Sequence, residues 1–178
     1  MSPSTNDPNN RMIRVMGIDP GSRHMGYGVV DGHGQRLLYV TSGTIAVPTS
    51  VPFPQRLGHI FRAVSRIIQE TTPDECAVED VFMAHNPRSA LVLGQARGAA
   101  VVAGVHAGLP VSEYSALQIK QAVVGYGKAD KDQVGRMVRT LLGITEKITP
   151  HAADALAVAV CHINTRFTHQ SWNLWEGR

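Results

Sequence analysis

The sequence is poor in cysteine and has no long hydrophobic run. Its two cysteines, Cys76 and Cys161, lie far apart in the 178-residue chain, each within an apolar stretch. This spacing excludes the class of small secreted domains held by disulfides, and we expect both residues to be reduced thiols. The sequence shows no secretory signal, and no apolar run approaches the roughly 18 residues of a membrane-spanning helix. We therefore expect a cytoplasmic protein that makes no membrane contact.

A strong charge of either sign is also missing. The 17 lysines and arginines and 14 acids leave a formal net charge of +3, a modest excess that fits an anionic partner without proving one. The excess is concentrated between Gln118 and Arg139, where five basic residues occur with two acids. With 43% hydrophobic side chains, the chain is long enough for one domain with a substantial core.

The pattern along the chain predicts one domain between two terminal segments. Residues 1–12 are polar and are expected to form a disordered extension, residues 13–165 hold the periodic elements, and residues 166–178 form a C-terminal tail with both tryptophans. Apolar runs predict strands at Ile13–Asp19, His24–Val30, Leu37–Val47, Glu75–Val78 and Leu109–Ser112, with a turn over Asp31–Gly34. Helical spacing predicts helices at Phe53–Glu70, Ser89–Ala107, Ala116–Val124, Lys131–Leu142 and Ala152–Asn164. Three meandering strands followed by alternating helices and strands indicate a mixed α/β sheet flanked by helices.

Acidic residues stand at the ends of three predicted elements. Asp19 follows the first apolar strand, Glu79 follows the short strand of the middle region, and Asp154 lies in the first turn of the last helix. An acid at a strand tip costs stability unless it is paired, solvated or bound to cations. Taken singly, each has an ordinary structural explanation, such as a turn cap or a solvated strand end. Three in one small domain indicate a carboxylate cluster that holds metal ions.

Five motifs occur in an order and spacing that resemble one known family. They are Gly17–Ser22 with Gly26–Gly28, Glu79–Met83, Gly94–Gly98, Lys120–Gly125 and Ala152–Ala157. From about Arg14 to about Thr165 the chain resembles the RuvC family of bacterial Holliday junction resolvases. The resemblance implies a ribonuclease H-like fold, with residues 13–165 as a single nuclease domain. It further implies a homodimer that cuts two opposed strands of a four-way DNA junction, and cooperation with the branch-migration complex of RuvA and RuvB.

Two divalent metal ions, Mg²⁺ or Mn²⁺, are the expected cofactors. Such a pair assists both the attacking and the departing oxygen of phosphodiester hydrolysis. Asp19, Glu79 and Asp154 are the expected ligands and catalytic residues, with Asp19 central. His151 departs from the commoner family pattern, in which many members carry Asp. It lies three residues before Asp154 on the same helical face, after a predicted Thr149 cap, and we expect it to contact a metal ion or the attacking water. An imidazole ligand suits Mn²⁺ better than Mg²⁺.

DNA contacts are expected from the loop after Glu79 and from the basic segment. Phe82 is exposed to stack on an unpaired base at the junction centre, or it packs beneath the following helix. Arg88 can reach a phosphate. Lys120 and Lys131 match basic family residues near the scissile phosphate, and Lys128 belongs to a glycine-rich loop before Lys131. Arg136 and Arg139 are taken as solvated charges.

Two features leave alternatives open. The helix Ser89–Ala107 is rich in Ala and Gly, which fits close packing within the chain or a two-fold dimer interface. The turn Gly17–Ser22 also occurs in actin-like and hexokinase-like nucleotide folds, although these need two such domains and a longer chain. A DNA-binding module that has lost catalysis is a third function, with His151 as the sign of decay. The retained acids favour an active nuclease.

Overall fold

The fold is built on a mixed sheet of five strands. The computed structural model describes residues 11–33, 35–80 and 86–176, with residues 169–176 described as helix backbone alone. The strands are β1 (Ile13–Asp19), β2 (His24–His33), β3 (Arg36–Ala46), β4 (Glu75–Asp80) and β5 (Val111–Ser115). They lie in the order β3-β2-β1-β4-β5. The first three pair antiparallel, and β4 pairs parallel to both β1 and β5, which confirms the predicted mixed sheet.

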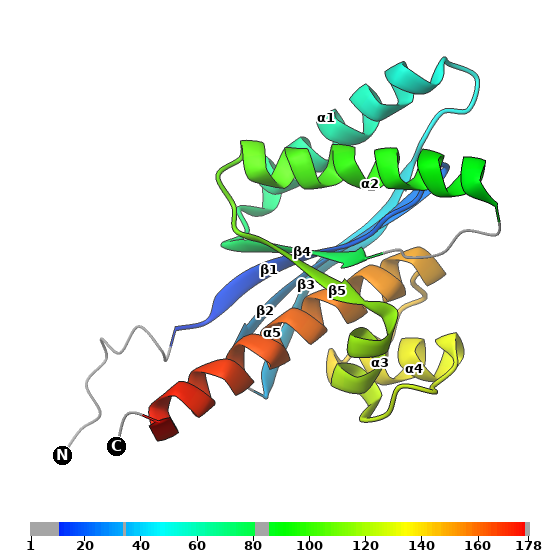
Figure 1. The fold of residues 1–178 in the computed structure, drawn as a ribbon. Coiled ribbons are helices and arrows are strands. Elements are labelled where there is room, and N and C mark those ends of the chain that lie inside the picture. The colour runs from blue at the N-terminus through cyan, green and yellow to red at the C-terminus, as the bar shows by residue number, and fades with distance from the viewer. Residues whose placement is uncertain (1–10, 34, 81–85, 177–178) are drawn as a thin grey trace.

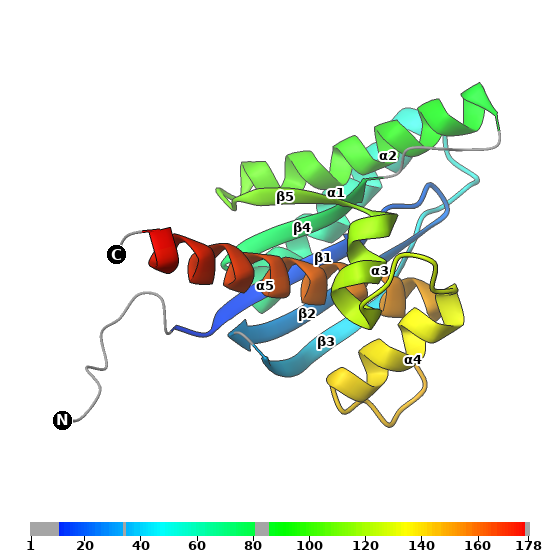
Figure 2. The same ribbon diagram turned by 60° about the horizontal axis from the view of Figure 1, so that its bottom comes forward.

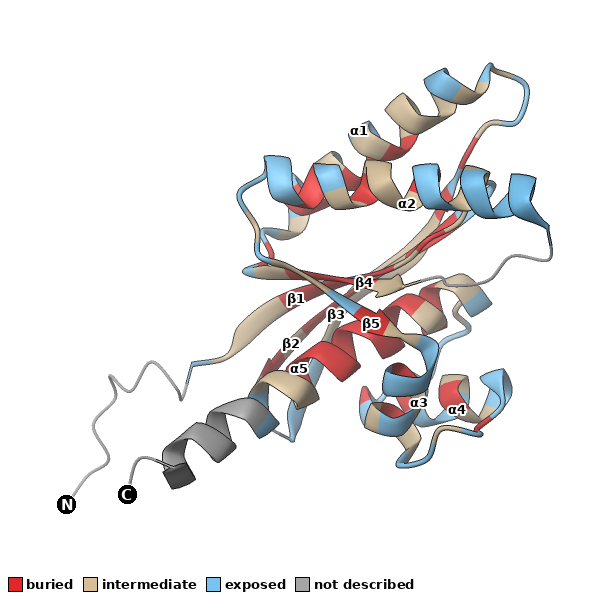
Figure 3. Ribbon diagram, viewed as in Figure 1, coloured by how far each residue is buried: buried red, intermediate tan, exposed pale blue. Residues whose placement is uncertain are grey.

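Helices cover both faces of this sheet. The helices are α1 (Phe53–Thr71), α2 (Pro87–His106), α3 (Ala116–Val124), α4 (Lys131–Leu141) and α5 (Pro150–Glu176). Helices α1 and α2 lie side by side on one face, while α5 crosses the other, with α3 and α4 beside it (Figures 1 and 2). Buried residues are concentrated in the strands and in the part of α5 that crosses them (Figure 3). Each face of the sheet therefore has its own hydrophobic core.

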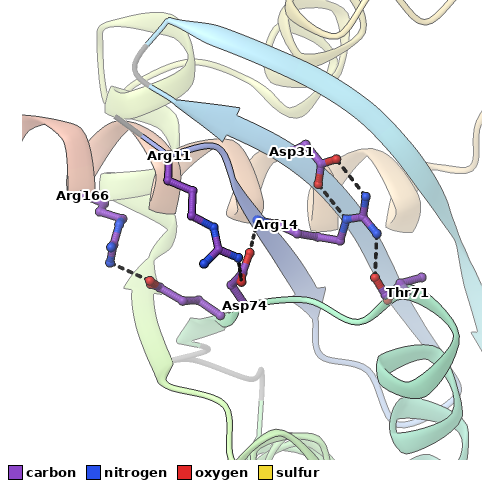
Figure 4. A network of polar contacts seen from close by, with 7 residues as sticks. Arg11, Arg14, Asp31, Thr71, Asp74 and Arg166 are labelled. Carbon is purple, nitrogen blue, oxygen red and sulfur yellow. Dashed lines mark hydrogen bonds and ion pairs between the residues drawn. The ribbon is translucent and has the colours of Figure 1, made fainter. Parts of the chain in front are cut away.

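The hairpin between β2 and β3 turns later than the sequence predicted. Asp31 and Gly32 continue strand β2, pairing with Leu38 and Leu37, so the predicted turn over residues 31–34 is wrong at its first residues. The Asp31 carboxylate accepts two hydrogen bonds from the Arg14 guanidinium on β1, at 2.7 and 2.9 Å (Figure 4). A Cβ on Gly32 would lie 2.7 Å from a methyl group of Ile163 on α5. Turn-forming residues therefore serve cross-strand pairing and helix packing here.

Helix α5 is longer than the sequence predicted. It runs to Glu176, although the prediction ended it at Asn164. The amide of Asn164 donates to the main-chain oxygen of Ala122, which ties this turn of α5 to α3. The sequence between Pro150 and Gly177 contains neither glycine nor proline, so no local signal ends the helix earlier. The expected disorder of residues 1–12 falls mostly outside the described residues.

Candidate active site

Two of the predicted acids lie at the carboxyl ends of the central strands. Strands β1 and β4 are parallel neighbours, with Ile18 opposite Val78, so the next residues, Asp19 and Glu79, lie at the same edge of the sheet. Asp19 is opposite Gly26 of β2. Open α/β sheets bind ligands at this edge of their strands. The N-terminus of α5 lies at the same end of the molecule (Figure 1).

The start of α5 brings the other two candidates to this edge. As predicted, Thr149 caps the helix, because its hydroxyl accepts a hydrogen bond from the Ala152 N–H at 3.2 Å. His151 and Asp154 follow in the first turns. A Cβ on Gly26 would lie 2.0 Å from the main-chain oxygen of His151, so only glycine at this position of β2 lets the helix approach so closely.

The imidazole of His151 contacts Asp19 directly. Its Nδ1 lies 2.8 Å from Oδ2 of Asp19. An ionised carboxylate only accepts hydrogen bonds, so Nδ1 is the donor, and in the neutral imidazole Nε2 then carries the lone pair. The ring of His24 stacks on that of His151, with centroids 5.9 Å apart and planes 18° from parallel. The imidazole is therefore held from two sides with one nitrogen left to bind a ligand.

Negative charge accumulates between these side chains. Burial, followed by repulsion from Asp19 and Asp154, raises the pKa of Glu79 to about 7. Burial also raises the pKa of Asp19, against the hydrogen bond from His151, which lowers it. Coupling of this kind requires the three carboxylates to lie near one another. A bound cation would relieve the repulsion.

Lys131 brings positive charge to these carboxylates. Its Nζ lies 3.1 Å from Oδ2 of Asp154, and attraction to that carboxylate raises the pKa of Lys131. Within the described residues, no group of three or more His, Cys or acidic side chains is drawn together closely enough to hold a metal ion. The chemistry of the donor set nevertheless fits one, because three mutually repelling carboxylates suit divalent cations and an imidazole suits Mn²⁺ in particular.

A cleft of about 140 Å³ opens beside the acids. Glu79, Asp154, Lys120 and Lys131 contribute its charged lining. Two of the predicted DNA-contacting lysines are thereby placed at the acids. Their ammonium groups offer the positive charge that a phosphate needs.

Two other predicted DNA contacts do not line this cleft. Lys128 and Arg88 are exposed, and neither is among the described residues that line it. Phe82 lies outside the described residues. Asp80, which the sequence analysis left out of the metal ligands, forms an ion pair with Arg97 at 3.4 Å.

Arg97 is a residue whose contribution to the site the sequence analysis missed. From α2 its Nε donates to the main-chain oxygen of Glu79 at 3.3 Å, and its guanidinium also pairs with Glu113 at 2.6 Å. Arg97 therefore holds the carboxyl-terminal end of β4, which carries Glu79, in place. The motif Gly94–Gly98 contained the signal, but sequence alone did not show what its arginine contacts. His24, which stacks on His151, was missed as well.

This sheet order, with acids at the tips of β1 and β4 and at the start of α5, defines the ribonuclease H-like class of nucleases. The family model described as crossover junction endodeoxyribonuclease RuvC matches residues 15–162. The chain belongs to this RuvC family. Membership sets aside the nucleotide-binding kinase and ATPase alternatives.

Relatives and solved structures agree with this assignment. A crossover junction endodeoxyribonuclease RuvC of Geobacter sulfurreducens is 58% identical over 153 residues, which cover 86% of this chain and 93% of that protein. One from Magnetococcus marinus is 52% identical over 158 residues, with 89% and 88% covered. The structure of T. thermophilus RuvC in complex with a Holliday junction substrate matches with a TM-score of 0.83 and 36% identity, covering 88% of this chain and 96% of that one. The yeast mitochondrial resolvase Ydc2, at 13% identity and a TM-score of 0.65 over 92% of this chain and 84% of its own, shares the fold.

Proposed function

We propose that this protein resolves four-way DNA junctions in recombination and repair by nicking two opposed strands. The observation that carries the proposal is the convergence of acids from β1, β4 and α5 at one edge of the sheet, where they repel one another electrostatically. Support comes from the 58% identical relative and from the junction complex of T. thermophilus RuvC. Residues 13–165 would form the nuclease domain.

The proposed site hydrolyses a phosphodiester with divalent metal ions. When bound, these ions make water more nucleophilic and stabilise the departing oxygen. Asp19 would be the central ligand, since it is largely buried, contacts His151 and interacts electrostatically with Asp154. Glu79 and Asp154 would hold the ions with it, and all three must be ionised to do so. Lys131, held at Asp154, and Lys120 attract the scissile phosphate into the cleft.

We propose two ions per subunit, Mg²⁺ or Mn²⁺, with His151 as a ligand to one of them or to the attacking water. The support is the position of its Nε2, which is left with a lone pair while Nδ1 donates to Asp19. Phe82, Arg88 and Lys128 remain proposed DNA contacts. In the sequence Phe82 precedes α2, Arg88 lies in the first turn of α2, and Lys128 lies just before α4.

A homodimer fits both the substrate and the exposed face of α2. A four-way junction presents two equivalent strands, and a two-fold protein presents two equivalent sites. Leu91, Val102 and Val105 are 57–67% exposed, and with Gly94 and Gly98 they form one stripe along α2. A Cβ on either glycine would meet no described residue of this chain within 4 Å, so packing against that part of the chain does not explain either glycine. Sedimentation equilibrium tests the dimer, and Gly98→Leu should weaken it.

We also propose cooperation with the branch-migration complex of RuvA and RuvB and a cytoplasmic location. Both proposals are supported by the resemblance to the RuvC family. In the described part of the chain, no helix has the length and apolarity needed to cross a membrane.

A cleavage assay on paired substrates tests the proposed function. A synthetic four-way junction and a linear duplex of the same arms are incubated with the protein and Mg²⁺ or Mn²⁺. Paired, symmetric nicks in the junction are expected, with the duplex intact. Junction binding without nicks in either metal would instead favour a DNA-binding module that has lost catalysis.

A further inference from the structure

Two arginines of α4 are exposed and unpaired although they lie beside the active site. Arg136 and Arg139 are three residues apart on one face of the helix. Among the described residues, neither guanidinium has a hydrogen bond or an ion pair with another side chain. Other arginines of the fold are paired, such as Arg97 with Glu113 and Arg166 with Glu75. Arg136 and Arg139 thus place two cations, without a partner in the described part of the chain, on one face of α4.

The two arginines line a groove that leads into the catalytic cleft. The groove has a volume of about 370 Å³ and runs between α4 and the segment 148–151 that begins α5. Arg136 and Arg139 line it together with His151 and Asp154. Asp154 and Lys131 also line the cleft that contains Glu79, so the groove and the cleft are continuous.

The same arginines also border a second hollow beyond the groove. It has a volume of about 410 Å³ and includes Gly143 and Thr145. Arg136 and Arg139 therefore stand between two hollows, on a path that leads away from the acids. A ligand that follows this path must be extended. It passes the candidate metal site and then contacts the guanidinium groups of Arg136 and Arg139.

Charge decides what kind of ligand fits. Lys131 is already bound to Asp154, and Asp132 is the other acid that lines the groove. Apart from Lys131, which the groove shares with the cleft, the cations that line the groove are the two guanidinium groups. A guanidinium matches a phosphate with parallel hydrogen bonds and stays charged at every relevant pH. Consecutive phosphates of one nucleic-acid strand meet both the extended shape and the charge.

We propose that this groove binds phosphates of the cleaved DNA strand next to the scissile phosphate, with Arg136 and Arg139 as the contacts. The proposal rests on the proposed junction-cutting function, and it replaces the expectation that both arginines are only solvated. Backbone contacts of this kind position the strand without reading its sequence.

Salt-dependent junction binding tests the contacts. Binding of the synthetic four-way junction is measured in EDTA, so that no cleavage occurs, over a series of salt concentrations. The double variant Arg136→Gln with Arg139→Gln should bind about ten-fold more weakly and should lower the slope of log affinity against log salt by about two. Arg62→Gln removes an equally exposed charge from α1, on the opposite face of the sheet, and should match the wild type.

Two further variants fix the interpretation. Replacing both arginines with lysine keeps the charge and should restore most of the slope. Asp132→Asn removes the acid from the groove and should raise affinity about two-fold. An unchanged slope in the glutamine double variant would overturn the proposal, as would an equal loss in Arg62→Gln.

Uncharged phosphate analogues show which phosphates of the DNA the two arginines contact. After the cut has been mapped with the wild type, single methylphosphonates replace the phosphates beside it. At one or two of these positions the methylphosphonate should weaken junction binding by the wild type. The same substitution should leave junction binding by the glutamine double variant unchanged. Equal losses in both proteins would refute contact with the cleaved strand. If the wild type fails to cut the junction at all, the proposed function fails instead, so the two failures are distinguishable.

Discussion

Nδ1 of His151 lies 2.8 Å from Oδ2 of Asp19, which joins the first turn of α5 to the tip of the central strand. The contact fixes the orientation of the imidazole, and the stacked ring of His24 supports it from the side. The nitrogen left over is Nε2, whose lone pair is available to a metal ion. This relationship gives His151 a function that a surface histidine would not have.

Metal preference follows from this imidazole. Because nitrogen ligands favour Mn²⁺ over the harder Mg²⁺, junction cleavage should be at least as fast in Mn²⁺. His151→Asp should shift the preference toward Mg²⁺ by about three-fold or more, since it supplies an oxygen ligand. Initial rates in a titration of each metal measure the effect. Faster wild-type cleavage in Mg²⁺ would count against His151 as a ligand.

Glu79 makes the stability of the metal-free protein depend on pH. Its pKa is about 7 in the folded state, against an ordinary value of 4.5, so the folded chain holds a proton that the unfolded chain releases in this range. Stability from this group is present below the unfolded value and is lost as pH rises through about 7. Thermal unfolding in EDTA should therefore show a falling midpoint between those pH values, and Glu79→Gln should flatten the fall. Parallel profiles for the two proteins would contradict the assignment.

Arg97 should affect the rate of cleavage more than the affinity for DNA. Arg97→Gln frees the end of β4 and leaves Asp80 and Glu113 without their cation, so kcat should fall about 10–100-fold with little change in KM. The lost pairing also costs about 1–3 kcal/mol of stability. Arg97→Lys keeps the charge but not the bond to the Glu79 oxygen, and should recover only part of kcat.

A matched control distinguishes an effect of Arg97 on the position of Glu79 from an effect on the stability of the whole protein. Arg166→Gln breaks an ion pair with Glu75, at 2.5 Å, on the amino-terminal side of β4. It should lower the unfolding temperature while leaving the cleavage rate of the folded protein intact. An equal loss of kcat in both variants would mean that Arg97 acts only through general stability.

Lys131 should contribute one phosphate contact. Its ammonium lies at Asp154 in the cleft, so Lys131→Ala should weaken junction binding for all sequences and reduce the salt slope by about one. Lys120→Ala should act similarly, because Lys120 lines the same cleft. Fluorescence anisotropy over a salt series measures both slopes. A slope equal to that of the wild type would remove either lysine from the interface.

Most of the fold was predictable because its elements have strong periodic signals. Strand β1 and helix α3 match their predicted bounds, and α1 differs by one residue, since a regular apolar face or run is bounded there by proline or glycine. The β2–β3 turn was misplaced because Asp31 has a partner, Arg14, that lies on another strand. Such long-range contacts decide the outcome where local turn propensity is ambiguous.

The candidate site was predictable to the level of its acids. Asp19 and Glu79 end apolar runs, and parallel pairing of those strands places them at one edge. The contact of His151 with Asp19 joins residues 132 apart in the sequence, and the clamp of Arg97 on Glu79 depends on how α2 packs. Neither has a local pattern. Likewise, the groove that Arg136 and Arg139 line beside the acids depends on how α4 packs against the start of α5.

Replacement of Asp19 by asparagine tests the central claim most directly, namely that the acids converge to bind catalytic metal ions. The side chain keeps its size and its contact with His151, but it loses the charge that holds a divalent cation. The rate of nicking of a four-way junction is measured for both proteins at saturating Mg²⁺ and Mn²⁺. We predict that Asp19→Asn binds the junction and cuts it at least about a thousand-fold more slowly. Cleavage at the wild-type rate would contradict the account.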